Sequence, residues 1–245
     1  MGMRHSGALW ILAAAFVGYA VLPDVLGRRN PRALRRGASE TGMVALTFDD
    51  GPHPEITPIV LDHLAAAGAH GTFFVVGENV HRYPHMVRRI VEEGHSLGVH
   101  TTTHPHAWVT TPGRIRREMT GGLESIVEAT GRRPFWFRPP YGAFNAVTWN
   151  CADALRLQVA LWSCDAGDWL PGASREGIRR RVVGGLSSGA IVDLHDGGQT
   201  PRGCWAMAEA LPEILAVARE RGLRPVHLGE LFGLPAMAEP AAVSP

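Results

Sequence analysis

The stretch ALTFDDGPHP, residues 45–54, decides the fold of this chain and raises the question of what the chain does. Its apolar half is typical of a short buried strand, and the Gly-Pro pair that follows is typical of a turn. Two adjacent carboxylates, Asp49 and Asp50, stand where the strand is expected to end. A polar turn alone can account for such a pair, so a chemical role for it needs support from the rest of the chain.

Composition indicates one large domain and excludes several functional classes. The chain has 245 residues, of which 45% are hydrophobic, which is enough for a single domain with a substantial core. A formal net charge of +1 gives no general attraction to polyanions, so we expect no nucleic-acid partner. Cys151, Cys164 and Cys204 are an odd number without CxxC spacing, which argues against a disulfide framework and a thiolate zinc site.

Short apolar runs alternate with longer amphipathic segments along most of the chain. The expected strands cover residues 44–48, 71–76, 95–100, 135–138, 158–163, 190–195 and 224–228. The expected helices cover residues 55–67, 84–93, 115–130, 146–155, 175–183 and 205–221. The sequence has neither a GxGxxG loop nor a P-loop, so this alternation predicts an α/β fold, a distorted barrel of about seven parallel strands.

Ionisable residues recur at the carboxyl ends of the expected strands. They are Asp49 and Asp50, His100, Arg138, Asp165 and His195. Because the carboxyl ends of parallel strands meet on one face of a barrel, where barrel enzymes build their active sites, these side chains should lie together. The pattern therefore predicts an active site on this face.

Two histidine pairs have the spacing of a shared metal site. His100 and His104 belong to HTTTH, and His81 and His85 belong to HRYPH. Spacing cannot choose between the pairs, but HTTTH leaves a strand on the same rim as Asp50, whereas HRYPH precedes a helix. We therefore expect Asp50, His100 and His104 to hold a divalent cation with open positions, as catalytic sites do.

The remaining motifs supply proton-transfer and substrate-binding groups. With Asp50 on the metal, Asp49 is free to act as a general base. In FRPPYG, Arg138 can orient a carboxylate, Pro139 stiffens the loop, and the backbone N–H of Tyr141 can bind an oxyanion. His195 is the expected general acid. In DAGDW, Asp165 is the expected partner that orients His195, and Trp169 offers an aromatic wall.

Five motifs in order resemble those of the polysaccharide deacetylases of carbohydrate esterase family 4. They are TFDDGP at 47–52, HTTTH at 100–104, RPPY at 138–141, DxxDW at 165–169 and a strand-terminal LHD at 194–196. The resemblance covers about residues 43–231 and implies a distorted barrel with a zinc-type metal. By the same resemblance the metal ligands are Asp50, His100 and His104, the base is Asp49, the acid is His195, and Arg138, Tyr141 and Asp165 assist them. The ligand set also accepts cobalt, nickel or manganese.

One position departs from the family pattern. The family has a leucine two residues before the histidine of the last motif, where it lines the pocket of the acetyl methyl group, and this chain has Asp193. Asp193 and His195 should project to the same face of their strand, so Asp193, with Pro139 and Trp169, is a candidate pocket residue. Alternatively, Asp193 turns aside to pair with an arginine. The identity of the acyl group therefore stays open.

The N-terminal residues differ in composition from the rest. Arg4 and His5 precede an uncharged run at 7–22, which suits an uncleaved anchor, a cleaved signal or a buried helix. We expect an anchor or signal at 1–26, a basic linker at 27–42, a catalytic domain at 43–233 and a flexible tail at 234–245. The linker arginines favour a cytoplasmic domain by the positive-inside rule. The family resemblance favours the opposite side, and we expect export, with secretion if the segment is cleaved.

Together these features predict a metal-dependent hydrolase that removes N-acetyl groups from the amino sugars of a peptidoglycan- or chitin-like glycan. We expect a monomer anchored to the membrane. One alternative is a deformylase or deacetylase of a lipid-linked sugar at the membrane. A second is a catalytically silent glycan-binding protein on the same fold.

Overall fold

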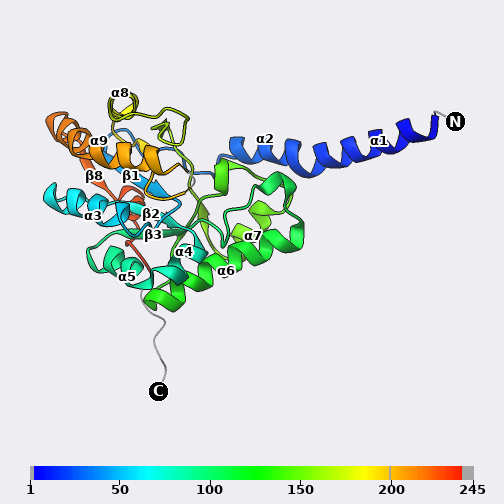
Figure 1. Cartoon of the computed structure of the whole chain (residues 1–245), viewed down its shortest axis with the longest axis horizontal. Helices are drawn as coiled ribbons and strands as arrows, with labels where there is room; N and C mark the ends of the chain where they lie inside the picture. Colours follow the sequence, from blue (N-terminus) through cyan, green and yellow to red (C-terminus); the bar gives the residue numbers. More distant parts are fainter. Residues whose placement is uncertain (1–2, 199, 239–245) are drawn as a thin grey trace, which may run out of the picture.

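The computed structural model describes residues 3–198 and 200–238. A curled parallel sheet is surrounded by helices, and a long N-terminal helix projects from one side of this body (Figure 1). The part of the predicted flexible tail from residue 239 onward lies outside the described residues.

The sheet follows the order β5-β4-β3-β2-β1-β7-β6, and every pairing in it is parallel. Its strands are β1 (Met43–Asp49), β2 (Thr72–Val75), β3 (Ser96–Val99), β4 (Trp136–Phe137), β5 (Gln158–Val159), β6 (Cys164–Asp165) and β7 (Ile191–His195). A further strand, β8 (Arg224–Val226), pairs with the first residues of β1. The predicted α/β fold with a distorted barrel is therefore confirmed.

The helices connect successive strands and cover the outside of the sheet. They are α3 (Ile56–Ala66), α4 (Gly77–Arg82), α5 (Pro84–Glu92), α6 (Pro112–Thr130), α7 (Thr148–Ala154), α8 (Arg175–Gly185), α9 (Pro201–Glu220) and α10 (Leu228–Leu231). All six helices expected from the sequence are present, with ends that differ by a few residues. The short α4 and α10 were not expected.

The apolar run at 158–163 is not one strand, which corrects the sequence prediction. β5 ends at Val159, and β6 begins at Cys164 at the other end of the sheet. Between the two strands, the backbone N–H of Leu34 donates to the Val159 carbonyl at 2.9 Å, and the Leu34 carbonyl accepts from the Leu161 N–H at 2.8 Å. The run therefore pairs with the segment that precedes β1, and the chain crosses the opening of the half-barrel there.

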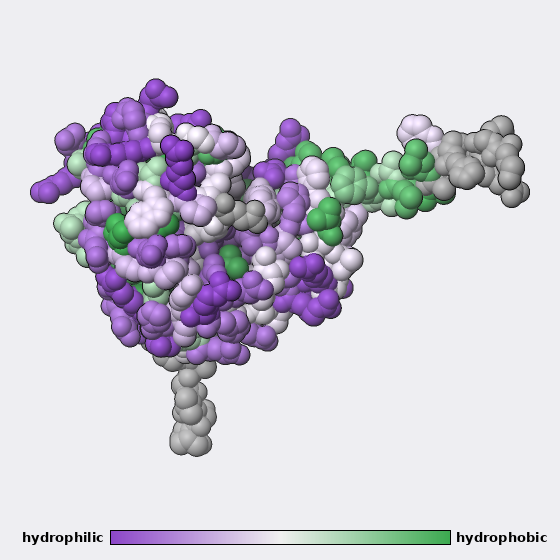
Figure 2. All heavy atoms as spheres, viewed as in Figure 1, coloured by the Kyte–Doolittle hydropathy of each residue, from purple (hydrophilic) through white to green (hydrophobic). Residues whose placement is uncertain are grey.

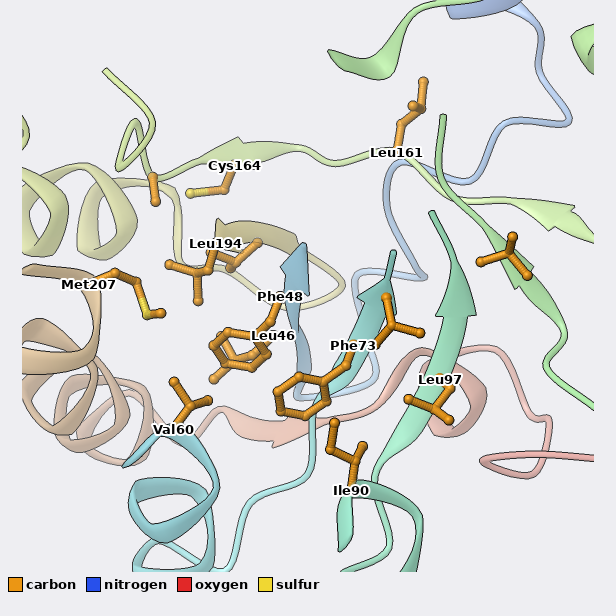
Figure 3. Packing of buried hydrophobic residues seen from close by; sticks show 14 of the residues in the cluster. Leu46, Phe48, Val60, Phe73, Ile90, Leu97, Leu161, Cys164, Leu194 and Met207 are labelled. Atoms are coloured by element: carbon orange, nitrogen blue, oxygen red, sulfur yellow. The ribbon is translucent and has the colours of Figure 1, made fainter. Parts of the chain in front are cut away.

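Side chains of the strands alternate between the helices and the barrel interior. In β1, Leu46 and Phe48 point outward, where Phe48 stacks on Phe73 with ring centroids 4.9 Å apart (Figure 3). Val60 of α3 and Met207 of α9 complete this outer core. Because these apolar contacts fix the outward set of each strand, they also fix which residues point into the barrel.

The inward positions change from apolar to ionisable along the strands. Ala45 and Ile191 lie deep in the barrel, in an apolar cluster with Trp136. Every second residue of a strand points inward, so the inward positions nearer the carboxyl ends are Asp193 and the strand-end residues Asp49, Arg138 and His195. The barrel interior is therefore filled by apolar side chains at one end and lined by ionisable side chains at the other.

The N-terminal helix is continuous from α1 (Met3–Phe16) through a π-helical turn (Val17–Val21) to α2 (Leu22–Arg29). Its segment Leu9–Arg29 is long and apolar enough to cross a membrane, by length and composition. The apolar side chains of this projecting part stand out from a mainly polar body in Figure 2, and Trp10 is 74% exposed. The apolar helix expected from the sequence is present.

The segments next to both chain ends pack against the barrel. In the predicted basic linker, Gly37 donates to the Gly189 carbonyl at 2.7 Å, and Ala33 is buried. In the described part of the predicted tail, Met237 is buried, and the Ala236 carbonyl accepts a hydrogen bond from Ser96. The packed fold therefore extends beyond residues 43–233 on both sides.

Candidate active site

A cleft of about 430 Å³ opens at the carboxyl ends of the strands. Its walls bring together nine of the sequence-predicted site residues around one space: Asp49, Asp50, His100, His104, Tyr141, Asp165, Trp169, Asp193 and His195. The cleft is also lined by Val76, Glu78, Asn79, Gly142, Trp162, Gly198 and Thr200. The prediction of a site on this face therefore agrees with the position of the cleft.

Asp50, His100 and His104 converge on one side of the cleft. The Nε2 atoms of His100 and His104 lie 3.3 Å and 3.0 Å from Oδ1 of Asp50. Their ligand atoms all lie within 4.8 Å of one another, close enough to share one cation. His81 and His85 take no part in this group, and His81 instead lies 3.3 Å from the Ser125 hydroxyl.

Three further observations fit a cation between these side chains. Nδ1 of His100 lies 2.7 Å from the Arg138 carbonyl and donates to it, so Nε2 is the ring nitrogen that faces Asp50 and is available to a cation. Oδ1 of Asp50 is buried and has no hydrogen-bond partner among the described residues. Although burial disfavours the carboxylate, His100 and His104 hold the pKa of Asp50 well below its usual range.

The backbone is strained at the same place. Five non-glycine residues among those described have a positive φ, and four of them belong to this rim: Asp50, Thr101, His104 and Tyr141. Left-handed conformations cost energy for residues with a Cβ, and they concentrate at functional sites, where the surrounding structure holds them. Packing and hydrogen bonding here maintain a geometry that local preferences oppose.

Arg138 links the two carboxylates on the floor of the cleft. Its guanidinium is fully buried, and Nη1 donates to Oδ1 of Asp49 at 2.8 Å and to Oδ1 of Asp193 at 2.6 Å. The guanidinium also lies over the Phe74 ring, 4.2 Å from its centroid. A buried arginine without a counter-charge is costly, so these carboxylates and Arg138 form one unit.

Asp193 satisfies both alternatives considered for it, because it lines the cleft and also pairs with Arg138. Burial, together with the neighbouring charge of Asp49, raises the pKa of Asp193 well above its usual range. One guanidinium cannot neutralise two buried carboxylates, and the pair therefore favours a proton on Asp193.

His195 faces Asp49 across the strand pair, because β1 and β7 pair these residues directly. Nδ1 of the His195 ring lies 2.9 Å from Oδ1 of Asp168, and the backbone N–H of His195 donates to Oδ2 of Asp168 at 2.7 Å. Burial opposes the charged imidazolium, but the charge and hydrogen bond of Asp168 outweigh it and raise the pKa of His195 well above its ordinary value. Nε2 is left to face the cleft.

Asp168 takes the place that the sequence prediction gave to Asp165. Asp165 ends β6, and its Oδ1 accepts from the Gly167 N–H and from Nε1 of Trp169 instead of reaching His195. Gly167, with φ +66°, reverses the chain so that Asp168 returns over β7. The DxxDW motif contained both carboxylates, but only the turn between them decides which one contacts the histidine.

Aromatic rings form the outer walls of the cleft. Tyr141 is 51% exposed, and its ring packs against His104 and His106 with centroids 4.7 Å and 5.0 Å away. Trp169, which is 47% exposed, and Trp162 also line the cleft. Exposed aromatic faces of this kind suit the apolar faces of sugar rings.

Pro139 is not a cleft residue, which corrects its assignment to the pocket. It is buried and lines a small separate void with Ala107 and Phe137, while its carbonyl accepts from the Gly142 N–H. Asn79 is a cleft residue that the sequence motifs did not indicate, and its side-chain amide donates to the Asp50 carbonyl at 2.9 Å. Asn79 lies on α4, a helix that the hydrophobic pattern did not predict.

Comparison with known proteins agrees with this geometry. A family model described as polysaccharide deacetylase matches residues 36–160. A peptidoglycan-N-acetylglucosamine deacetylase of Bacillus cereus is 38% identical over 194 residues, which are 78% of this chain and 88% of that protein. The chain belongs to the polysaccharide deacetylase family.

Solved structures of deacetylase-family proteins share the fold. A crystal structure of a peptidoglycan N-acetylglucosamine deacetylase in complex with 4-naphthalen-1-yl-N-oxidanyl-benzamide superposes with a TM-score of 0.79 at 31% identity. The match covers 84% of this chain and 94% of that one. A pseudoenzyme of carbohydrate esterase family 4 from Bacillus anthracis gives a TM-score of 0.72 at 27% identity, covering 81% of this chain and 68% of that one. Membership of the family therefore does not by itself establish catalysis.

Proposed function

We propose that this polysaccharide deacetylase family member is a metal-dependent hydrolase of the N-acetyl amide of amino sugars in a peptidoglycan- or chitin-like glycan. The observation that carries the proposal is one cleft in which Asp50, His100 and His104 face Asp49 and His195. The first three side chains suit a cation, and the last two can take up and deliver protons. The relatives named above support the amide of N-acetylglucosamine as the bond attacked.

Asp50, His100 and His104 are the proposed ligands of one divalent metal ion, with zinc as the first candidate and cobalt, nickel or manganese as others. A metal bound there would polarise the amide carbonyl and make water a better nucleophile. Oδ1 of Asp50 and Nε2 of His100 already face the shared space, so the ligand atoms need little rearrangement.

The chain's own groups manage the protons. Asp49 accepts a proton from the attacking water, and the hydrogen bond from Arg138 holds this carboxylate in place beside the cleft. The Tyr141 backbone N–H donates to the oxygen that becomes negative in the transition state. His195, kept protonated by Asp168, delivers a proton to the leaving amine. The C–N bond breaks as the amine takes this proton, and acetate and the free amino sugar are released.

Acetate release tests this proposal. The purified chain, stripped by a chelator and reloaded with zinc, is incubated with N-acetylglucosamine oligomers and with peptidoglycan fragments, and mass spectrometry counts the acetyl groups. We expect loss of acetyl groups only after metal is restored. Glycan binding without acetate release under every metal would overturn the proposal in favour of a silent binding protein.

We further propose that the N-terminal helix anchors the protein and that the catalytic domain lies outside the cytoplasm, where glycans of the cell wall are found. The apolar segment Leu9–Arg29 supports an anchor. The five arginines between residues 28 and 36 favour the opposite orientation, but a domain that follows an export signal can translocate regardless of charge. A reporter fused after Pro245 should be active outside the cytoplasm, and activity confined to the cytoplasm would contradict this orientation.

A lipid-linked amino sugar is the second candidate substrate. It is favoured because the end of the apolar helix is hydrogen-bonded to the wall of the cleft, through Arg28 and the Tyr141 carbonyl. This contact keeps the cleft close to the segment proposed to enter the membrane. A preference for a lipid-linked N-acetyl sugar over a free oligomer of the same length, measured in detergent micelles, would favour this candidate.

A further inference from the structure

The last turns of the N-terminal helix contact the loop that carries Tyr141. Oδ1 of Asp24 accepts from the Phe144 N–H at 2.8 Å, and Nη2 of Arg28 donates to the Tyr141 carbonyl at 3.2 Å. Arg28 is itself held by Oδ2 of Asp24, 2.9 Å from its Nε. Asp24 is buried, and its carboxylate contacts the Phe144 end of the loop directly and the Tyr141 end through Arg28. Two side chains one helical turn apart therefore clamp residues 141–144.

Backbone packing brings the helix close enough for this clamp. Gly27 lies directly against Phe144, and a Cβ added at Gly27 would come within 2.6 Å of Cγ of that ring. Eight residues earlier on the helix, the Tyr19 carbonyl accepts from the Ala146 N–H at 3.0 Å. The contact between helix and loop is thus extended and tight, although the N-terminal half of the same helix projects away from the body (Figure 1).

Tyr141 is held both from within its own loop and from outside it. It has φ +59° and ψ 12°, the left-handed conformation that disfavours a residue with a Cβ. The peptide before it is fixed by the Ala143 N–H, which donates to the Pro140 carbonyl at 3.0 Å. The peptide after it is fixed at its N–H, where Gly142 donates to the Pro139 carbonyl at 2.9 Å, and at its carbonyl, which accepts from Arg28. Both peptides that flank Tyr141 must be held for its N–H to keep one direction.

The Tyr141 N–H is available for substrate. Within the described part of the chain it has no hydrogen-bond acceptor, whereas the N–H groups of Gly142, Ala143 and Phe144 all have one. We propose that Arg28, oriented by Asp24, is a positioning residue that holds the Tyr141 N–H toward the developing oxyanion. This inference rests on the proposed function, and it adds that a residue of the apolar N-terminal helix completes the active site.

The consequence is that the N-terminal helix has two roles. Its projecting part has the properties of an anchor, and its last two turns stabilise a strained loop of the cleft. Arg28 acts on the transition state and not on substrate binding, because the oxyanion forms only as the amide is attacked. Removal of Arg28 should therefore lower kcat and leave KM nearly unchanged.

The experiment compares Arg28→Ala with the matched control Arg32→Ala in the full-length, metal-loaded protein. Arg32 lies on the same basic segment and pairs with Asp153 at the surface, so its loss removes the same charge without touching the Tyr141 loop. We expect Arg28→Ala to lower kcat about tenfold, a fraction of the ~10²–10³-fold that loss of an oxyanion donor costs. KM and Tm should stay close to those of the unaltered protein, and Arg32→Ala should change neither kcat nor KM.

Two further measurements separate positioning from folding. Arg28→Lys, which can still donate to the Tyr141 carbonyl, should recover part of kcat, and hydrogen exchange of the amides of residues 141–144 should accelerate in Arg28→Ala alone. Asp24→Asn provides a milder variant that keeps the size of the side chain. An unchanged kcat in Arg28→Ala, an equal loss in Arg32→Ala, or exchange that accelerates over the whole domain would overturn the inference.

The failure of this inference is distinguishable from failure of the proposed function. If the unaltered protein releases no acetate under any metal, the proposed function fails, and the positioning role is decided by exchange at residues 141–144 in Arg28→Ala. If the unaltered protein turns over and Arg28→Ala matches it in kcat, only the positioning role fails.

Discussion

The two sides of the cleft use the same residue types for opposite purposes. On one side, Asp50 lies between His100 and His104, and its pKa is held well below the usual range. On the other side, Asp193 and His195 lie close to further carboxylates, and the pKa of each is raised well above its ordinary value. The first side presents a carboxylate and two imidazole nitrogens to a cation, and the second side retains protons on Asp193 and His195.

Neighbouring charges produce this difference. Burial acts on both sides and disfavours every charged form. Asp50 has two imidazoles beside it, whereas Asp193 shares a single guanidinium with Asp49. His195 has Asp168, while His100 has a backbone carbonyl that only fixes its tautomer. The function of each aspartate and histidine here is therefore set by its partner and not by its type.

The largest effect should come from removing a metal ligand. His100→Ala should abolish stoichiometric metal binding and lower activity by at least ~10³-fold, because metal supplies several kcal/mol of transition-state stabilisation. Metal analysis of the purified protein, together with acetate release, checks both. His81→Ala is the control, since His81 contacts Ser125 away from the cleft. Loss of metal in His81→Ala would show that the wrong histidine pair has been chosen.

The twin carboxylates of the opening motif test whether the two sides are distinct. Asp49→Asn should retain metal and lose about 10² to 10⁴-fold in rate, the usual contribution of a general base. Asp50→Asn should weaken metal binding itself, because Oδ1 of Asp50 is the atom that both imidazoles face. Equal loss of metal in the two variants would refute this division of labour.

Asp168 should control the pH range of the proton-retaining side. The pKa of His195 is raised by Asp168, so Asp168→Asn should lower it and move the alkaline limb of the rate profile to lower pH. The raised pKa also stabilises the fold below the ordinary histidine value of 6.5, and this contribution is lost as pH rises through the folded pKa. Asp168→Asn should therefore show a weaker dependence of stability on pH.

Asp165→Asn is the matched control for this pH effect. Asp165 lies three residues earlier in the same motif, but its Oδ1 contacts Gly167 and Trp169 rather than His195. We expect its alkaline limb to stay in place. A shift in Asp165→Asn with none in Asp168→Asn would restore the assignment made from the sequence.

The smallest effect should come from Asp193, which modifies the site without completing it. Asp193→Leu makes the pocket wall apolar and should improve hydrolysis of N-acetyl relative to N-formyl substrates by about tenfold or less, the scale of one methyl group in an apolar pocket. Asp193 favours its proton, so its replacement removes little charge near His195, and the alkaline limb should move slightly at most. Rates on paired N-acetyl and N-formyl substrates across pH measure both properties. An unchanged preference would show that the acyl group is recognised elsewhere, and a large shift of the alkaline limb would show that Asp193 is ionised in the unaltered protein.

The sequence by itself determined the face of the fold on which the ionisable residues meet. Parallel strands bring their carboxyl ends to one edge, so Asp49, His100, Arg138 and His195 were placed together once their strands were predicted. The period of two along a strand likewise put Asp193 on the same face as His195. These inferences succeed because strand direction and side-chain alternation are local properties of the chain.

Contacts between segments distant in the sequence were decided only by the tertiary structure. Asp168 rather than Asp165 reaches His195 because Gly167 reverses the chain above β7. The apolar run at 158–163 does not form one strand, because the backbone of Leu34, far away in sequence, hydrogen-bonds to Val159 and Leu161. Arg28 meets Tyr141 across more than a hundred residues. Hydrophobic periodicity and motif spacing do not predict such contacts, because the contacts form, and stabilise the structure, only when the whole chain has packed.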